Sequence, residues 1–225
     1  MLKETLVVAA IRPWNMKQFR RWHPPQGCRK VLISRKEDLT PERLRKLNPR
    51  YIFFPHWSWI IPKSVHEQFE CVVFHMTDLP FGRGGSPLQN LLSRGIYRTK
   101  ISALRVDGGL DTGPIYMKRA LNIGHGSAHD IYKEASALSF AMMTDIVAKQ
   151  LRPKPQRGKA VTFKRRTPEM SKLPSRLTMR QAYDFIRMLD APEYPPAFVE
   201  CGDRRITLRN ARLKKGSVSA DAEIT

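Results

Sequence analysis

The sequence predicts an α/β protein with a doubly wound, mostly parallel sheet and a small C-terminal α+β appendage. In its first third, four apolar runs alternate with polar stretches of helix-forming composition. The runs do not alternate apolar with polar residues, which is typical of parallel strands buried on both faces. The length of 225 residues suffices for one sizeable domain with an appendage. We therefore expect a Rossmann-like arrangement of strands and helices.

Local signals define the elements before the fourth strand. A short helix is expected to begin after Thr40, because threonine is a good N-cap and Pro41 fits the first helical position. Residues 62–69 are also expected to be helical. The expected strands cover residues 6–11, 31–34, 51–54 and 71–74.

The sequence pattern changes after the fourth strand. Three glycines in residues 82–87 indicate a loop, and a short helix is expected at 88–92. Two further strands, 99–106 and 115–121, flank a glycine-rich turn. Ser127 is expected to cap a long helix, whose apolar residues keep helical spacing: Ile131, Ala135, Leu138, Met142 and Ile146.

The C-terminal part is expected to be a subdomain rather than an independent domain. We expect one domain over residues 1–150, a basic linker at 151–160, a small subdomain at 161–216 and a disordered tail at 217–225. The subdomain is expected to contain strands at 161–163, 197–200 and 205–208, and a helix that Thr178 caps.

Composition indicates an anionic partner. The formal net charge is +20, which favours nucleic acid, an acidic membrane surface or a phosphorylated small molecule. No apolar run is long enough for a membrane span. The three widely spaced cysteines argue against a disulfide framework and a structural zinc site, and they favour a cytoplasmic protein.

Two polar residues stand where ligands bind in doubly wound sheets, beyond the carboxyl ends of strands. His75 directly follows the fourth strand, and glycines shortly after it allow close approach of the backbone to a ligand. Asp111 lies in a glycine-flanked turn. Taken alone, His75 has the alternative of a hydrogen-bonded loop histidine, and Asp111 that of an ordinary Asx-turn.

Taken together, residues 75–115 resemble the formyltransferase family that uses N10-formyltetrahydrofolate. That family includes methionyl-tRNA, glycinamide ribonucleotide and nucleotide-sugar formyltransferases. Its first motif is Asn-x-His at a strand end, then Leu-Leu-Pro and Tyr-Arg-Gly, and here His75, Leu79-Pro80 and Arg83-Gly84 are in step with it. Its second motif, Asp-x-Gly-x-Asp-Thr-Gly, is matched in full by residues 107–113. The resemblance covers residues 50–150 well and implies that residues 1–150 form a catalytic domain.

The resemblance implies a mechanism for His75 and Asp111. An amine attacks the formyl carbon, and His75 stabilises the negative charge that develops on the oxygen. Asp111 holds and polarises His75 and helps to take the proton that the amine loses. One position departs from the family: its Asn is replaced by Val73, which has no donor. We expect His56 or Ser58 to supply the missing contact, and the alternative is that His56 is a loop histidine beside packing tryptophans.

The resemblance also implies which residues bind the two substrates. The cofactor is N10-formyltetrahydrofolate, with tetrahydrofolate as the product, and no metal ligand is expected. Acceptor contacts are expected from Arg12, Arg83, Gly84, Ser86 and Gln89. Cofactor contacts are expected from Trp57, Ser58, Trp59, Ile60, Ile61, Val106, Asp107, Gly108 and Gly109.

The expected acceptor is the amine of a nucleotide-linked amino sugar, because the appendage is too short for a separate tRNA-binding domain. Three alternatives stay open: formyl transfer to an aminoacyl-tRNA, folate or nucleotide binding without catalysis, and hydrolysis of the cofactor by water. A homodimer also stays open. A nucleic acid would contact the basic residues in and after the linker: Arg152, Lys154, Arg157, Lys159, Lys164, Arg165 and Arg166.

Overall fold

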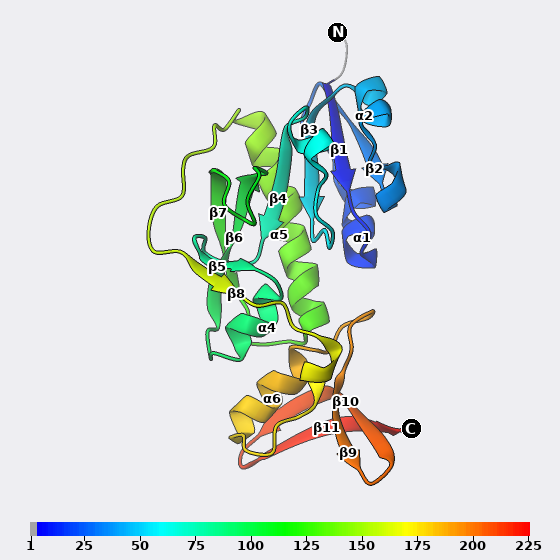
Figure 1. Ribbon diagram of the computed structural model, residues 1–225, viewed down its shortest axis with the longest axis vertical. Coiled ribbons are helices and arrows are strands. Elements are labelled where there is room, and N and C mark those ends of the chain that lie inside the picture. Colours follow the sequence, from blue (N-terminus) through cyan, green and yellow to red (C-terminus); the bar gives the residue numbers. More distant parts are fainter. Residues whose placement is uncertain (1–3) are drawn as a thin grey trace. The chain divides into compact units, whose positions relative to one another are not determined.

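The structure is a computed structural model that describes residues 4–225, which form two units (Figure 1). Unit 1 comprises Met1–Arg83, Lys100–Leu121 and Lys133–Thr162, and unit 2 comprises Gly84–Thr99, Asn122–Tyr132 and Phe163–Thr225. These six segments alternate along the chain, so the chain passes between the units five times. The division differs from the boundary expected at residue 150, because two early segments pack with the C-terminal part.

A six-stranded sheet lies mainly in unit 1, in the order β2-β1-β3-β4-β6-β7 (Figure 1). β1 pairs in parallel with β2 and β3, β3 pairs in parallel with β4, and β6 is antiparallel to β4. The predicted doubly wound, mostly parallel sheet is thereby confirmed. The strands are β1 (Glu4–Ala9), β2 (Cys28–Ile33), β3 (Pro49–Pro55), β4 (Cys71–His75), β6 (Arg98–Arg105) and β7 (Ile115–Asn122).

Helices cover this sheet through buried apolar contacts. On one face, Leu44 of α2 (Pro41–Leu47) and Val65 of α3 (Lys63–His66) share a buried cluster with Ile52 and Phe54 of β3. A 3₁₀ turn (Lys36–Asp38) precedes α2, and Thr40 caps α2 as expected.

Two further helices lie side by side, α1 (Pro13–Arg21) and α5 (Ala128–Ala148). Trp22, which ends α1, packs edge-on against Phe140 of α5 and donates its indole N–H to Thr144 at 2.9 Å. The long helix expected after Ser127 is confirmed, whereas α1 was not expected, because the side chain of its N-cap residue, Arg12, makes no capping bond.

The glycine-rich segment after β4 begins as a strand rather than the loop expected over residues 82–87. β5 (Phe81–Gly84) forms a two-stranded sheet with β8 (Val161–Phe163). Glycine weakens a strand in isolation, and the partner strand, distant in sequence, is what makes this segment extended. The expected strand at 161–163 is confirmed.

Unit 2 contains a three-stranded antiparallel sheet in the order β11-β10-β9, with α6 packed on β10. Thr178 caps α6 as expected: its hydroxyl accepts from Gln181 N–H at 3.3 Å, and Gln181 Oε1 accepts from Thr178 N–H at 2.9 Å. The elements are α4 (Pro87–Leu92), a 3₁₀ turn (Pro168–Ser171), α6 (Met179–Arg187), β9 (Ala197–Cys201), β10 (Arg204–Lys214) and β11 (Ser217–Ile224).

The expectation of a disordered tail at 217–225 is corrected by β11. Leu213 lies opposite Val218, and Leu208 lies opposite Ala222, in the β10–β11 pairing. The tail has an apolar residue at every second position, which is the period of a strand with one packed face. Pairing with the long strand β10 orders a segment whose small and polar residues alone indicate disorder.

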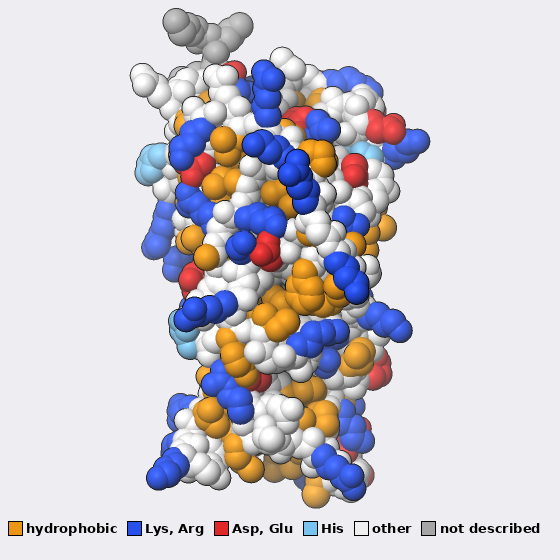
Figure 2. Space-filling view, turned by 90° about the vertical axis from the view of Figure 1, so that its left-hand side faces the viewer, with side chains coloured by type: hydrophobic (Ala, Val, Ile, Leu, Met, Phe, Trp, Pro, Cys, Tyr) orange, Lys and Arg blue, Asp and Glu red, His pale blue; other side chains and the backbone are white. Residues whose placement is uncertain are grey.

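Basic side chains are spread over the surface rather than gathered at one place. On the face shown in Figure 2, Lys and Arg side chains occur from end to end, and Asp and Glu side chains are sparse. By sequence, Lys and Arg residues outnumber Asp and Glu residues in both units. Within residues 4–225, no helix is long and apolar enough to cross a membrane.

Candidate active site

His75 and Asp111 come together in unit 1. His75 is the last residue of β4, and its Nδ1 lies 3.5 Å from Oδ2 of Asp111. Its Nε2 lies 2.7 Å from the carbonyl oxygen of Gly82, so Nε2 carries a proton and donates to that carbonyl. The two side chains are only 10% and 15% exposed. The structure thus holds the imidazole between a carbonyl and a carboxylate.

The loop that carries Asp111 folds back along β4. It starts beside the first residue of β4, where Val106 N–H donates to the carbonyl of Cys71 at 2.9 Å. Asp107 shapes the loop by accepting from Gly109 N–H at 3.0 Å and from the Thr112 hydroxyl at 2.6 Å. The first Asp of the motif therefore folds the loop that brings the second one to His75.

One glycine of this motif is required by close packing. A Cβ atom at Gly113 would lie 1.8 Å from the carbonyl oxygen of Arg105, which no side chain tolerates. Asp111 itself has a φ of +53°, in the left-handed region that a residue with a side chain rarely adopts. The conformation of Asp111 is thus imposed by its surroundings.

Val73 lies on the same face of β4 as His75, since alternate strand residues share a face. It is partly buried against the apolar core cluster, against which Trp57 and Val106 also pack. Two expected cofactor contacts, Trp57 and Val106, and the residue in place of the family's Asn, Val73, therefore pack against the same apolar cluster. We call this cluster the apolar floor.

His56 follows β3 and is held in an unusual state. Its φ is +54°, and its ring lies 5.5 Å from that of Trp14. Burial, aided by the nearby positive charge of Arg12, lowers the pKa of His56 to about 3. Arg12 also donates from Nη2 to the Ser58 hydroxyl at 3.3 Å. The imidazole of His56 is therefore neutral at neutral pH.

The segment after β3 has the character of a site for a flat ligand. Trp57 packs edge-on against Trp59 at 5.0 Å, and its indole N–H is buried without a hydrogen-bond partner among residues 4–225. Trp59 and Ile60 are 40% and 90% exposed, and Leu110 of the second motif is 65% exposed, whereas Ile61 is buried in the core. Exposed apolar residues here, beside a buried indole N–H without a partner, fit a pterin, which needs a flat apolar slot and a few polar contacts.

The residues expected to contact the acceptor fall in both units. Arg12 and Arg83 belong to unit 1, and Gly84, Ser86 and Gln89 belong to unit 2. The Ser86 hydroxyl accepts from Arg166 N–H at 3.0 Å. Gln89 is 4% exposed, and its amide donates to the Tyr132 hydroxyl at 3.0 Å and to the Met188 carbonyl at 2.9 Å. The Gln89 amide thus serves the interior of unit 2.

Gln156 is the residue that the sequence did not reveal. It lies in the segment expected to be a plain basic linker, yet its amide reaches Asp111, Gly113 and Arg83 of unit 1. No periodicity or motif within the linker signals these contacts.

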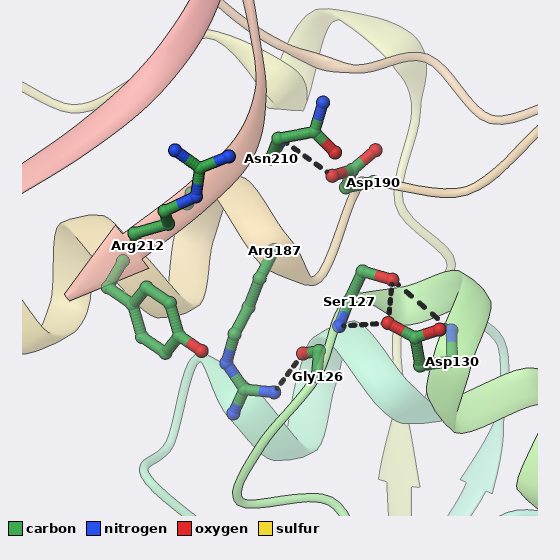
Figure 3. Close-up of a pocket in the computed structure, with 9 residues that line it drawn as sticks. Gly126, Ser127, Asp130, Arg187, Asp190, Asn210 and Arg212 are labelled. Carbon is green, nitrogen blue, oxygen red and sulfur yellow. Dashed lines mark hydrogen bonds between the residues drawn. The ribbon is translucent and has the colours of Figure 1, made fainter.

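A cavity of about 280 Å³ lies in unit 2, and none of the residues expected to act is among those that line it (Figure 3). Its polar groups bond to one another: the Ser127 hydroxyl donates to Asp130 at 2.7 Å, and Asn210 N–H donates to Asp190 at 2.8 Å. These bonds tie the start of α5 and the end of α6 to their surroundings. The lining residues are Gly126, Ser127, Asp130, Tyr183, Arg187, Asp190, Asn210, Ala211 and Arg212.

Family models match most of the chain. Residues 29–145 match the model described as formyl transferase, and residues 168–225 match the model described as the C-terminal domain of methionyl-tRNA formyltransferase. The chain belongs to the formyl transferase family. Formyltransferases of this family use N10-formyltetrahydrofolate, so the expected family, enzyme class and cofactor agree with these matches.

Relatives of this formyl transferase chain carry the name methionyl-tRNA formyltransferase. The solved structure of that name from Clostridium thermocellum is 46% identical, with a TM-score of 0.96 and 99% of both chains covered. A curated relative from Thermodesulfovibrio yellowstonii is 24% identical over 191 residues, which are 82% of this chain. The chain spans only 61% of the length of that relative, and 42% of another from Halorhodospira halophila.

The expectation of an amino-sugar acceptor is wrong. The sugar N-formyltransferase from Shewanella sp. is only 14% identical, with a TM-score of 0.66, although it covers 95% of this formyl transferase chain. That likeness shows the fold alone. The expectation rested on an appendage judged too short for a separate C-terminal domain, but residues 168–225 match the model of the C-terminal domain of methionyl-tRNA formyltransferase.

Proposed function

We propose that this chain transfers a formyl group from N10-formyltetrahydrofolate to the amine of methionyl-tRNA. The observation that carries the proposal is the 46% identity, over 99% of both chains, to the methionyl-tRNA formyltransferase of Clostridium thermocellum. The pairing of His75 with Asp111 supports it, because an acyl transfer needs a donor for the developing oxyanion and an acceptor for the proton of the amine. The cytoplasmic location expected from the cysteines stays a prediction.

We assign roles to this chain's own residues accordingly. The cofactor supplies the formyl group, and the segment from Trp57 to Ile61 and the loop from Val106 to Gly109 hold it. His75 donates to the formyl oxygen, which requires its Nε2 proton to be shared between Gly82 and the substrate. Asp111 orients His75 and takes up the proton that the amine loses. His56, with its neutral ring, supplies the donor that Val73 lacks.

Exposed basic residues are proposed to contact the RNA backbone. Six of the seven expected residues are exposed, whereas Arg166 is half-buried over the ring of Phe185 at 5.5 Å. Arg166 therefore belongs to the packing of unit 2 rather than to the contact surface. The exposed residues are Arg152, Lys154, Arg157, Lys159, Lys164 and Arg165.

Incubation with N10-formyltetrahydrofolate and methionyl-tRNA tests the proposal. The expected products are tetrahydrofolate and formylmethionine, the latter recovered after deacylation of the tRNA. Asp111→Asn should lower turnover about 100- to 10,000-fold, since general acid–base contributions have that size, while leaving the melting temperature unchanged. His56→Ala should also lower turnover, and unchanged turnover removes His56 from the mechanism.

The same experiment separates the remaining alternatives. Release of tetrahydrofolate at the same rate with and without methionyl-tRNA would show hydrolysis by water. Saturable binding of the cofactor without any turnover would show a binding protein that lost catalysis with the Asn. Either result contradicts the proposed transfer.

A further inference from the structure

The side chain of Gln156 links two segments of the candidate site. Its Nε2 donates to the carbonyl oxygens of Asp111 at 2.8 Å and Gly113 at 2.9 Å. Its Oε1 accepts from Nε and Nη2 of Arg83 at 3.2 Å and 2.8 Å. A guanidinium only donates and a carbonyl only accepts, so these partners fix one orientation of the amide. All hydrogen-bonding groups of the Gln156 amide are thereby used.

These bonds complete a closed chain of contacts that includes His75. Asp111 faces Nδ1 of His75, and Gly82 accepts from Nε2. Gly82 is the sequence neighbour of Arg83, which bonds Gln156, and Gln156 returns to the backbone of Asp111. Both groups that hold the imidazole are thus connected to each other through Gln156, independently of the imidazole itself.

The segment that carries Gln156 is itself fastened on both sides. Lys154 pairs with Ile115 at the start of β7, through N–H···O bonds of 2.8 and 2.7 Å. Val161 N–H donates to the carbonyl of Pro80 at 3.1 Å. Residues 154–161 therefore form a fixed strap rather than a free linker, and Gln156 has a rigid base from which to act.

Asp111 needs such support because of its backbone. The left-handed conformation at φ +53° is unfavourable for a residue with a side chain. Donation from one amide to the carbonyls of Asp111 and Gly113 favours the turn in which these two oxygens converge. Without it, the loop would relax and the Asp111 carboxylate would move from His75.

We propose that Gln156 is a positioning residue for the formyl transfer, which holds Asp111 against His75 by clamping the backbone of residues 111–113 to Arg83. This inference rests on the proposed function. It also gives Arg83 a role through Gln156 instead of a direct contact with the acceptor.

Gln156→Glu is the sharpest variant, because it retains the length of the side chain and the oxygen that accepts from Arg83. It removes the N–H donors and places a carboxylate oxygen against two carbonyl oxygens. We expect kcat to fall about 10- to 100-fold, the usual effect of losing a group that orients a catalytic one. The KM values for both substrates should stay close to those of the wild type.

Gln68→Glu is the matched control. Gln68 also joins a guanidinium to a backbone carbonyl, accepting from Arg45 at 2.9 Å and donating to Ser64 at 2.7 Å. It lies on the surface after α3, so its substitution should leave kcat unchanged. Any general effect of a Gln-to-Glu change appears in both proteins.

Two measurements need no substrate. In Gln156→Glu, amide hydrogen exchange should accelerate at residues 107–113 and stay unchanged in the strands, and the ring-nitrogen NMR signals of His75 should shift. If the wild type transfers no formyl group to methionyl-tRNA, the proposed function fails, while these two measurements still decide whether Gln156 positions Asp111.

Wild-type kcat together with unchanged exchange at residues 107–113 overturns the inference. A raised KM at unchanged kcat also overturns it, because Gln156 would then contact a substrate. If Gln156→Glu does not fold, Gln156→Ala decides by the same measurements, since it opens the clamp without adding a charge.

Discussion

Asp184 and Arg187 form an ion pair in the interior of unit 2, one turn apart on α6. Arg187 Nε donates to Asp184 Oδ1 at 2.7 Å, and the two side chains are 4% and 2% exposed. Arg187 also donates to the carbonyls of Gly126 and Ile123 at 2.9 Å, while the Tyr97 hydroxyl donates to Asp184 at 2.7 Å. The pair thus joins α6 to Tyr97, which precedes β6, and to the backbone of Ile123 and Gly126, which follow β7.

Asp184→Ala should lower the free energy of unfolding by about 3–5 kcal/mol, because it leaves a buried guanidinium without its counter-ion. Urea denaturation measures the loss. Asp145→Ala is the control: Asp145 pairs with Arg119 and with Lys149, whose side chain is 64% exposed, and removal of such pairs costs about 0–1 kcal/mol. Equal losses in the two variants would show that burial of the Asp184–Arg187 pair does not increase its contribution to the free energy of unfolding.

The lowered pKa of His56 predicts a dependence of stability on pH. Between pH 6.5 and about 3, the unfolded chain binds a proton at His56 and the folded chain does not, so stability falls as the pH falls through this range. The contribution is at most about 1.4 kcal/mol per pH unit. His56→Asn, which tolerates the left-handed backbone, should have a correspondingly shallower fall. Parallel curves for the two proteins would contradict the neutral, buried state of His56.

Val73→Asn restores the residue of the family motif on an apolar floor. Since Val73 is partly buried against an apolar cluster, an amide there should cost about 1–3 kcal/mol of unfolding free energy. Val73→Thr, nearly the same shape with one hydroxyl, should cost less. A fully stable Val73→Asn protein with raised turnover would instead show that the floor has room and partners for the family's amide.

Binding of methionyl-tRNA should weaken steeply with rising salt concentration if the basic residues of the segment 152–159 contact phosphates. Replacing Arg152, Lys154, Arg157 and Lys159 by Ala should reduce the slope of log affinity against log salt by about 3–4, near 0.9 per lost phosphate contact. The charge-matched control removes four exposed residues of α1 and α2: Lys17, Arg20, Arg21 and Lys46. A filter-binding series that gives both proteins the same slope would place the RNA elsewhere.

Features that depend on neighbouring residues could be read from the sequence. The Thr178–Gln181 capping box and the apolar runs of β1, β3 and β4 are local, and the structure contains them. The meeting of His75 with Asp111 followed from a motif match, although the residues lie far apart in the chain.

Features that depend on distant partners could not be read in this way. β11 pairs with β10, and this pairing was not expected from the sequence of residues 217–225 alone. Gln156 bonds Arg83 and Asp111, which lie 73 and 45 positions away. Gln89 was expected to contact the acceptor, yet its partner Met188 lies 99 positions away and its amide is buried in the interior.

The alternating segments of the two units restrict how this chain can be recombined with its relatives. In a chimera joined at residue 162, this chain would supply only Phe163–Thr225 of unit 2. The other two segments, Gly84–Thr99 and Asn122–Tyr132, would come from the relative. The transferred Asp184 and Arg187 would then have to match a foreign Tyr97 and a foreign Gly126 backbone. The three segments of unit 2 would therefore have to be transferred together for these contacts to be kept.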